Sequence, residues 1–431
     1  MIAALLGFAA AFTLLFLRVP IATALALVGF GGLVLLNGWV PAMATLGMAA
    51  QSSTMAYSLS VLPLFVLMGN LVAGAGISGN LFRAAQMFIG RRRGGVAMAT
   101  ILACGGFGAI CGSSVATAAT MGRVAIPAMR SLGYHDRLST ATVAAGGTLG
   151  ILIPPSIVMV IYGVNTQTHI GKLFAAGLVP GVLAVLLYMA AVRWVVWRDP
   201  KAAPLAEHTD WTARLGVMRG LWPVFALFGL VMGGIYGGLF TATEAAGIGA
   251  TGALVFAIAH RGMRWADIGR VVVDSALVSA SMIGIVLGAA MFVEFINLTG
   301  VHKGLETLVK DSGASPFGVI LIIIAIYIVL GCLLESLSLI LITVPMFFPI
   351  VIGLGYDPVW FGIIVVVATE IGLITPPIGV NLFVIRSVAP EIAMKTIVKG
   401  MMPFITVDLL RILLLAALPA VVLWLPNRLF G

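Results

Sequence analysis

Charged side chains are scarce in this chain. Asp, Glu, Lys and Arg make up 9% of its 431 residues, whereas apolar residues make up 61%. An ordinary soluble domain is about 25% charged. A soluble protein of this composition would lack the polar surface that keeps it in solution. The composition therefore excludes a soluble enzyme, a nucleic-acid binder and a disordered chain, and it indicates an all-α integral membrane protein.

Motifs for catalysis and for tight metal binding are missing as well. Cys104, Cys111 and Cys332 lie in apolar stretches without metal-ligand spacing, and the chain has no P-loop. The GxGxxG pattern at 247–252 lies inside an apolar span with no strand before it, which is typical of close helix packing. Ser113 as a nucleophile would lack a His or Lys base within the apolar spans. We therefore expect the chain not to be an enzyme.

Apolar segments of about 20 residues predict ten helices that cross the membrane. They lie near 2–17, 20–39, 57–76, 138–164, 173–192, 218–238, 243–259, 272–298, 359–386 and 402–425. Two longer apolar stretches, 95–129 and 315–353, are interrupted midway by small and polar residues. Each of the two predicts a re-entrant hairpin that returns to its own side.

The basic residues predict the orientation of this layout. Eighteen of the 24 Lys and Arg residues fall on one face, and the positive-inside rule makes that face cytoplasmic. Both termini are then predicted to be periplasmic, and the net charge of +9 reflects cytoplasmic loops. The segment 78–93 predicts an amphipathic helix along the cytoplasmic surface.

The two halves of the chain resemble each other. LGILIPPSI (149–157) recurs as IGLITPPIG (371–379), with an offset of 222 between the Pro-Pro pairs. Each half contains five predicted spans, and because five is odd the second half would be inverted in the membrane. Inverted repeats with broken helices are typical of secondary transporters. The predicted organisation is a first repeat at 1–192 (hairpin 95–129, broken helix 138–164), a cytoplasmic linker at 193–219 and a second repeat at 220–431 (hairpin 315–353, broken helix 359–386).

The first hairpin and the first Pro-Pro break predict a cation site. Interrupted backbone survives in a membrane only where it is buried in protein or lines a polar cavity. The hairpin tip carries Gly112, Ser113 and Ser114, followed by Thr117, and the break frees carbonyls around 148–151. Such neutral oxygens suit a small monovalent cation, so tip and break together would form an oxygen cage for sodium. The alternative is that these small residues only let helices pack closely.

The second hairpin and break predict a related region with ionisable groups. The candidates are Glu335, Ser336, Thr369, Glu370, Thr375 and Asn381. An ionisable group within a membrane is a functional hypothesis by default. Glu335 or Glu370 would bind a cation or a proton, or would pair with Arg123 or Arg411 in a structural salt bridge. The N-termini of the half-helices favour an anionic substrate group, such as a carboxylate.

Three motifs together carry a family resemblance. They are GAICGSSVATAATMG (108–122), AGGTLGILIPPS (145–156) and ATEIGLITPPIGVNLFV (368–384). The chain resembles the large membrane subunit, of the DctM or SiaM type, of the tripartite ATP-independent periplasmic (TRAP) transporters. The resemblance implies sodium-coupled import of an organic anion by an elevator mechanism in the bacterial inner membrane. It also implies a periplasmic substrate-binding protein and a small four-helix membrane subunit, which we expect to be a separate chain.

The resemblance also implies where the ions and the substrate bind. One sodium site would combine Gly112, Ser113 and Ser114 with Gly147, Thr148 and Gly150. The second would combine Glu335 and Ser336 with Thr369, Glu370, Gly372 and Thr375. Substrate would lie between them, near Thr117, Pro154, Ser156, Pro377 and Asn381. C4-dicarboxylates, keto acids and sialic acid all stay open as substrates. The alternative function is a stand-alone sodium- or proton-coupled dicarboxylate symporter without a binding protein.

Overall fold

The computed structural model describes residues 2–90, 92–204, 221–261, 263–301, 304, 307, 311 and 313–431. Every regular element within these ranges is a helix, as expected for the all-α membrane class. Seven of the described helices are long and apolar enough to cross a membrane, and six further apolar helices are shorter. The predicted helical membrane protein is therefore confirmed at the level of its fold class.

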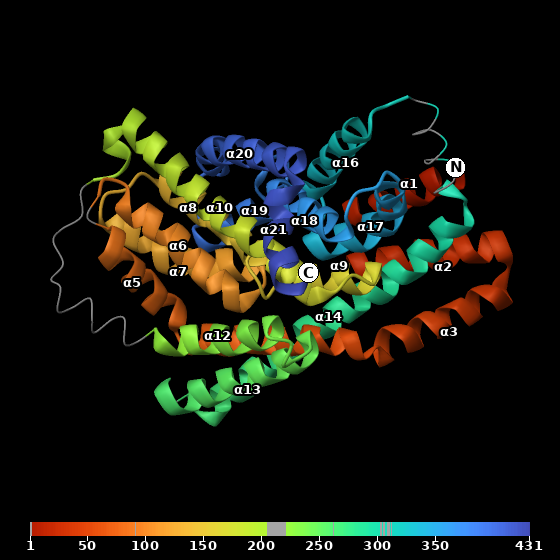
Figure 1. Ribbon diagram of the computed structural model, residues 1–431, viewed down its shortest axis with the longest axis horizontal. Helices are drawn as coiled ribbons and strands as arrows, with labels where there is room; N and C mark the ends of the chain where they lie inside the picture. Colours follow the sequence, from red (N-terminus) through yellow and green to blue (C-terminus); the bar gives the residue numbers. More distant parts are fainter. Residues whose placement is uncertain are drawn as a thin grey trace.

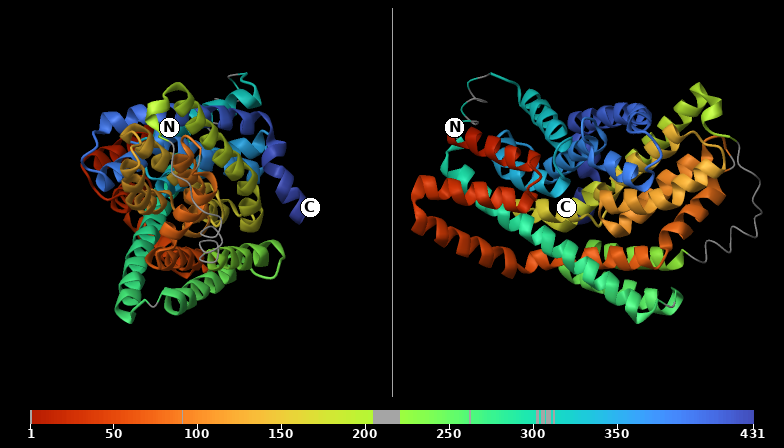
Figure 2. Two further views of the ribbon diagram at one scale, coloured as in Figure 1. Left: turned by 90° about the vertical axis from the view of Figure 1, so that its left-hand side faces the viewer. Right: turned by 180° about the vertical axis from the view of Figure 1, so that it is seen from behind.

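One group of helices forms a layer along one side of the molecule (Figures 1 and 2). Its members are α2 (Ile21–Asn37), α3 (Trp39–Met55), α4 (Val61–Gly74), α12 (Trp222–Tyr236), α13 (Ala242–Arg261) and α14 (Trp265–Leu298). The short helix η1 (Tyr57–Ser60) precedes α4, and α1 (Ile2–Phe16) packs against α2 and α14. Within an apolar 18-residue stretch of α14, only 28% is buried within the protein. This layer therefore presents much of its apolar surface to the lipid.

The remaining helices form a compact bundle over this layer (Figure 1). They are α5 (Ile77–Ile89), α6 (Gly95–Cys111), α7 (Ser114–Ser131), α8 (Asp136–Leu152), α9 (Ile157–Thr166), α10 (Ile170–Arg198), η2 (Pro200–Ala202), α16 (Pro316–Gly331), α17 (Ser336–Gly353), α18 (Pro358–Ile374), α19 (Val380–Val388), α20 (Met394–Ala417) and α21 (Pro419–Phe430). The most apolar window of α8 and α9 is 94% buried. Because α8 packs against α6, α7, α10, α18, α19 and α20, it lies at the centre of the bundle.

The order of elements in the bundle repeats. Ser114 and Ser336, the first residues of α7 and α17, are 222 positions apart, as are Asp136 and Pro358, the first residues of α8 and α18. The two repeated sets are α6–α9 and α16–α19. They also pack across each other, because α9 lies against α17 and α19 lies against α7. The second half of each broken helix is thus held by the hairpin of the other set.

Helix α3 lies in a segment for which the sequence predicts no membrane span. Its C-terminal part, at 51–54, is polar, so the segment lacks the hydrophobic run of a membrane span. The hydroxyl groups of Thr45 and Thr54 donate hydrogen bonds to the carbonyl oxygens of Pro41 and Ala50 one turn earlier. The helix therefore satisfies these polar side chains internally, which a scan for apolar runs does not detect.

Two other segments differ from their predicted bounds. The single span predicted at 402–425 is two helices, α20 and α21, that meet at Leu418. Leu418 leaves the helical conformation, with a φ of −125° and a ψ of 74°, because the following residue is Pro419 and proline disfavours a helical conformation in the residue before it. Helix α10 runs to Arg198, inside the predicted linker 193–219, and residues 205–220 of that linker and its flank lie outside the described residues.

Candidate functional site

The first hairpin turns within two residues. Helix α6 ends at Cys111, Gly112 takes a left-handed conformation with a φ of 65°, and α7 begins at Ser114. Glycine is the residue that adopts this conformation without steric cost. The Ser113 hydroxyl accepts a hydrogen bond from the N–H of Ala116 at 3.4 Å and so caps α7. Because Ser114 is buried, the positive end of the α7 dipole lies inside the protein.

The first broken helix is interrupted between α8 and α9. Helix α8 ends at Leu152, and a cis peptide bond joins Pro154 to Pro155. The Ser156 hydroxyl donates a hydrogen bond to the Ile151 carbonyl at 2.5 Å. Since Pro154 has no N–H, the carbonyl of Gly150 lacks the helical donor it would otherwise have. The break therefore leaves a backbone oxygen available for a ligand.

The hairpin tip and the break lie in direct contact. A Cβ atom on Gly112 would lie 2.8 Å from the Pro155 carbonyl oxygen. A Cβ atom on Gly150 would lie 2.6 Å from Thr117 Oγ1 and 2.7 Å from the Ser113 carbonyl oxygen. Thr117 Oγ1 is buried and makes no hydrogen bond with the described residues. Two oxygens, the Thr117 hydroxyl and the Ser113 carbonyl, thus lie against the backbone of Gly150 at the end of α8.

Thr148 faces a different side of α8 from Gly147. Gly147 packs on Ala118 of the hairpin, whereas the Thr148 hydroxyl lies 3.1 Å from the hydroxyl of Tyr188 on α10. One residue along an α-helix is a rotation of about 100°. The sequence prediction groups Gly147, Thr148 and Gly150 in one cage. The structure brings the two glycines against the hairpin, but the Thr148 side chain points to Tyr188 instead.

The second hairpin and break are built in a similar way. Helix α16 ends at Gly331, and Glu335 precedes the first residue of α17, Ser336, which is buried. The broken helix has a second cis peptide bond, between Pro376 and Pro377. The N–H of Gly379, in this break, donates a hydrogen bond to the Cys332 carbonyl of the hairpin tip at 3.1 Å. Backbone therefore joins the second tip directly to the second break.

Both hairpins cross their broken helices at paired glycines. A Cβ atom on Gly372 would lie 2.5 Å from the Cα atom of Gly331, and one on Gly108 would lie 2.7 Å from the Cα atom of Gly150. Real Cβ atoms essentially never come this close to another backbone atom. The two crossings therefore depend on the absence of side chains at these positions.

The polar residues of α18 use their groups in different ways. The hydroxyl groups of Thr369 and Thr375 donate hydrogen bonds to the carbonyls one turn earlier, at 2.8 and 2.5 Å, which leaves their oxygen lone pairs free. Glu370 Oε2 pairs with Arg411 at 2.7 Å, and both side chains are fully buried. The structure thus places Glu370 in the salt bridge that the sequence left as one of its two alternatives.

Asn381 brings the second broken helix against the first. Its side-chain N–H donates a hydrogen bond to the Ala144 carbonyl of α8 at 3.3 Å. Its Oδ1 atom is buried and makes no hydrogen bond with the described residues. Because α19 also packs against α7, Asn381 and Thr117 lie on neighbouring helices. Pro154 and Ser156 lie instead at the start of α9, which packs against α17.

Asp408 and Tyr188, which the sequence analysis does not single out, join Glu370 and Arg411 in a buried polar network. Asp408 contacts Arg411 at 3.0 Å and accepts a hydrogen bond from Tyr188 at 2.7 Å. The signal that could have found Asp408 is its spacing of three residues from Arg411 within one apolar segment. No comparable sequence signal points to Tyr188, because its partner lies 220 positions away.

Arg123 lies in a pocket between α7 and the end of α19. The pocket has a volume of about 390 Å³, and Arg123, Arg130 and Glu391 are its charged lining residues. Arg130 pairs with Asp136 and with Glu391. Arg123 is exposed and makes no ion pair with any described residue. It is therefore a cation that remains available to an anionic ligand.

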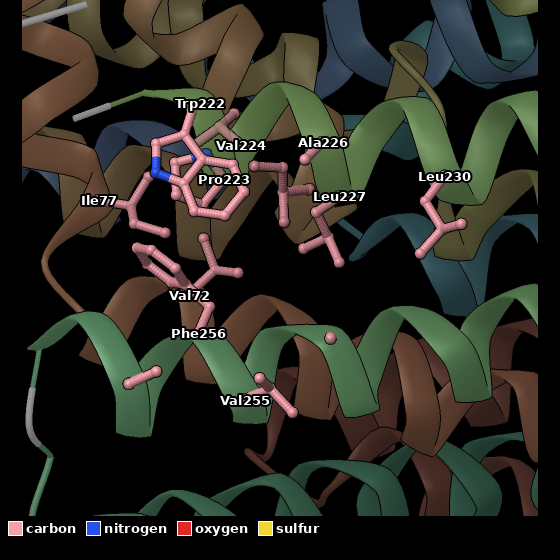
Figure 3. Close-up of a pocket in the computed structure, with 13 residues that line it drawn as sticks. Val72, Ile77, Trp222, Pro223, Val224, Ala226, Leu227, Leu230, Val255 and Phe256 are labelled. Carbon is pink, nitrogen blue, oxygen red and sulfur yellow. The ribbon is translucent and has the colours of Figure 1, made fainter. Parts of the chain in front are cut away.

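Another pocket lies beside the outer layer and is lined by apolar and aromatic residues. It has a volume of about 280 Å³ and lies between α12 and α13, where Trp222, Leu227 and Phe256 point into it (Figure 3). None of the residues predicted to bind ions or substrate lines this pocket. Its chemistry suits hydrocarbon and not a carboxylate.

Comparison with known proteins gives a consistent result across the chain. The family model described as "Tripartite ATP-independent periplasmic transporter, DctM component" matches residues 8–421. The C4-dicarboxylate TRAP transporter large permease protein DctM of Pseudomonas aeruginosa is 37% identical, and the alignment covers 86% of each chain. The sialic acid TRAP transporter large permease protein SiaM of Vibrio cholerae is 30% identical, with 97% of each chain covered.

A solved structure has a similar fold. The YdaH transporter of Alcanivorax borkumensis superposes with a TM-score of 0.62, and the superposition covers 89% of each chain at 15% sequence identity. At this identity the likeness concerns the fold alone. The arrangement of helices in the bundle is thus one that a known membrane transporter also adopts.

The glycine crossings generate a prediction about stability. Replacing Gly372 by Ala would insert a Cβ atom against the Gly331 backbone, and overpacking of this kind typically costs about 1–3 kcal/mol. We expect Gly372→Ala to lower the melting temperature of the purified chain. Gly233→Ala is the matched control, because nothing lies within 4 Å of a Cβ atom at that helical glycine. Equal melting temperatures for the two variants would contradict the close crossing.

Proposed function

This chain belongs to the DctM-component family of the TRAP transporters, and we propose that it imports a carboxylate-bearing organic anion together with sodium. As a large permease of that family it is a multi-pass transport protein of the inner membrane. In the proposed function a periplasmic binding protein delivers the substrate, and a small membrane subunit, on a separate chain, completes the transporter. The termini are proposed to face the periplasm.

The observation that carries the proposal is the contact between the first hairpin tip and the first break. The Ser113 carbonyl and Thr117 Oγ1 lie there against the backbone of Gly150, whose own carbonyl lacks its helical donor, and neither oxygen belongs to a charged side chain. In secondary transporters, carbonyls of unwound helices coordinate the coupling ion. A site of neutral oxygens suits a monovalent cation, and sodium is the cation we assign to it.

The anionic substrate is supported by a different set of features. Helix α7 begins at the buried Ser114, so its partial positive charge lies inside the bundle. Arg123 lies further along the same helix in the pocket beside α19 and has no described ion-pair partner. Guanidinium groups bind carboxylates in a bidentate way. We propose that Arg123 receives the carboxylate.

The two layers of the fold support an elevator mechanism. In the proposed movement, the bundle that contains α6–α9 and α16–α19 slides as a unit against the layer formed by α2, α4 and α12–α14 (Figure 1). Alternating access in transporters with inverted repeats is largely such a rigid-body motion. The contacts between each tip and its break would then travel with the substrate and the ions.

Reconstituted transport tests the proposal as a whole. We expect uptake into proteoliposomes that contain this chain and its small subunit to require both an inward sodium gradient and an added binding protein loaded with radiolabelled carboxylate. Uptake of free dicarboxylate without any binding protein would favour the stand-alone symporter. Uptake driven equally well by a proton gradient in choline buffer would contradict sodium coupling.

The first cation site can be tested at Ser114. We expect Ser114→Ala to raise the sodium concentration that gives half-maximal uptake and to leave expression intact, because the change removes one oxygen and keeps the Ser113 cap. Ser131→Ala is the control, since Ser131 is an exposed residue at the other end of α7. A sodium dependence identical in both variants would place the cation site elsewhere.

The carboxylate assignment can be tested at Arg123. A charge-assisted hydrogen bond contributes about 1.5–3 kcal/mol, which corresponds to roughly a tenfold to hundredfold loss of affinity when it is removed. We expect Arg123→Gln to raise the KM for uptake by about tenfold or more, with the sodium-induced rise in melting temperature unchanged. Arg270→Gln, at an exposed arginine of α14, is expected to leave the KM as it is. A normal KM for Arg123→Gln would exclude this role.

A further inference from the structure

The buried network around Asp408 connects equivalent positions of the two repeated sets of helices. Thr148 on α8 and Glu370 on α18 are 222 positions apart, the same offset that relates the two Pro-Pro pairs. Tyr188 on α10 and Arg411 on α20 are 223 positions apart. Each set therefore pairs a residue just before its break with a residue on the long helix that follows.

Asp408 joins these two pairs into one chain of contacts. The Thr148 and Tyr188 hydroxyl groups are 3.1 Å apart, and the Tyr188 hydroxyl donates to Asp408 Oδ2 at 2.7 Å. Asp408 Oδ1 is 3.0 Å from an Arg411 nitrogen, which in turn donates to Glu370 Oε2 at 2.7 Å. All five side chains are buried, with exposed fractions of 1% or less. The chain of contacts thus runs from one broken helix to the other without reaching solvent.

The charged groups of this network carry a desolvation cost that apolar side chains in the same place would not. Burying ions in an apolar interior costs desolvation energy, and well-packed apolar residues are often as stabilising as a buried ion pair. Two nitrogens of Arg411 and Glu370 Oε1 also make no hydrogen bond with the described residues. Buried ionic groups of this kind are best understood where they fix the register of packed elements.

The ends of the network lie next to the glycine crossings. Thr148 lies two residues before Gly150, and Glu370 lies two residues before Gly372. These are the glycines at which the broken helices meet their hairpins. Any rotation or shift of Thr148 or Glu370 would therefore move the backbone at a hairpin tip.

We propose that Tyr188 and Asp408 are positioning residues that hold the two broken helices in one register, so that cation binding at one break favours binding at the other. The inference rests on the sodium-coupled function proposed above. A cation at one break fixes the register of both broken helices through the network, and the second cation then binds at a break already held in position, which gives positive cooperativity. Coupling between sites typically changes affinity by about 5- to 150-fold.

The test is equilibrium binding of radioactive sodium to the purified full chain. The wild-type isotherm is expected to be sigmoidal, with a Hill coefficient above one. Tyr188→Phe removes a single oxygen atom and leaves every charge of the network in place. We expect it to lower the Hill coefficient to about one and to raise the half-saturating sodium concentration by about fivefold or more.

Matched variants separate positioning from simple stability. Tyr162→Phe is the control. Tyr162 is also a buried tyrosine, and its hydroxyl donates to the Pro358 carbonyl at 2.6 Å, outside the network. Thr148→Val is expected to give the same sodium-binding isotherm as Tyr188→Phe. Thr148→Ser keeps the hydroxyl group and is expected to give the wild-type isotherm. Melting temperatures measured without sodium report how much each substitution lowers the stability of the fold.

The possible results are distinct. A Tyr188→Phe chain that melts lower but binds sodium with the wild-type Hill coefficient would show that the network is only structural and would overturn the proposal. A wild-type isotherm with a Hill coefficient of one would overturn the proposal and leave sodium coupling intact. A wild-type chain that binds no sodium would overturn the proposed coupling ion together with this inference.

Discussion

The backbone contact between each hairpin and its broken helix is the constraint on which the rest of the bundle depends. A broken helix leaves carbonyl groups without partners, and lipid cannot satisfy them. The protein covers them by bringing another backbone into contact, at Gly108 with Gly150 and at Gly331 with Gly372. Such contact requires that neither partner carries a side chain. The same closeness places the Thr117 hydroxyl and the Ser113 carbonyl beside the first break.

This arrangement also makes the two sets of helices depend on each other for their packing. Helix α9 packs on α17 and α19 packs on α7, so each set supplies part of the surroundings of the other. Asn381 adds a hydrogen bond to the Ala144 carbonyl of α8, and Asp408 links the helices before the two breaks through Tyr188 and Arg411. In the proposed elevator mechanism, a bundle tied together in this way would move as one body against the outer layer.

Local chemistry explains how much could be predicted from the sequence. Proline and glycine act on the backbone within a residue or two, so the breaks at Pro154 and Pro376 and the turn at Gly112 lie where the sequence predicts them. Helix α3 was missed because a scan for apolar runs does not register a helix that ends in polar residues. The division of the last span at Leu418 was missed although Pro419 signals it, because the apolar run continues across the break.

The sequence by itself determined the membrane class, the family, and the places where helices break, since these follow from composition and from residues that act on their own backbone. The tertiary structure alone decided that Thr148 faces Tyr188, that Glu370 pairs with Arg411, and that Asp408 joins the two. These contacts depend on how α8, α10, α18 and α20 are rotated against one another. Rotation is set by packing among helices far apart in the chain, and no local pattern encodes it.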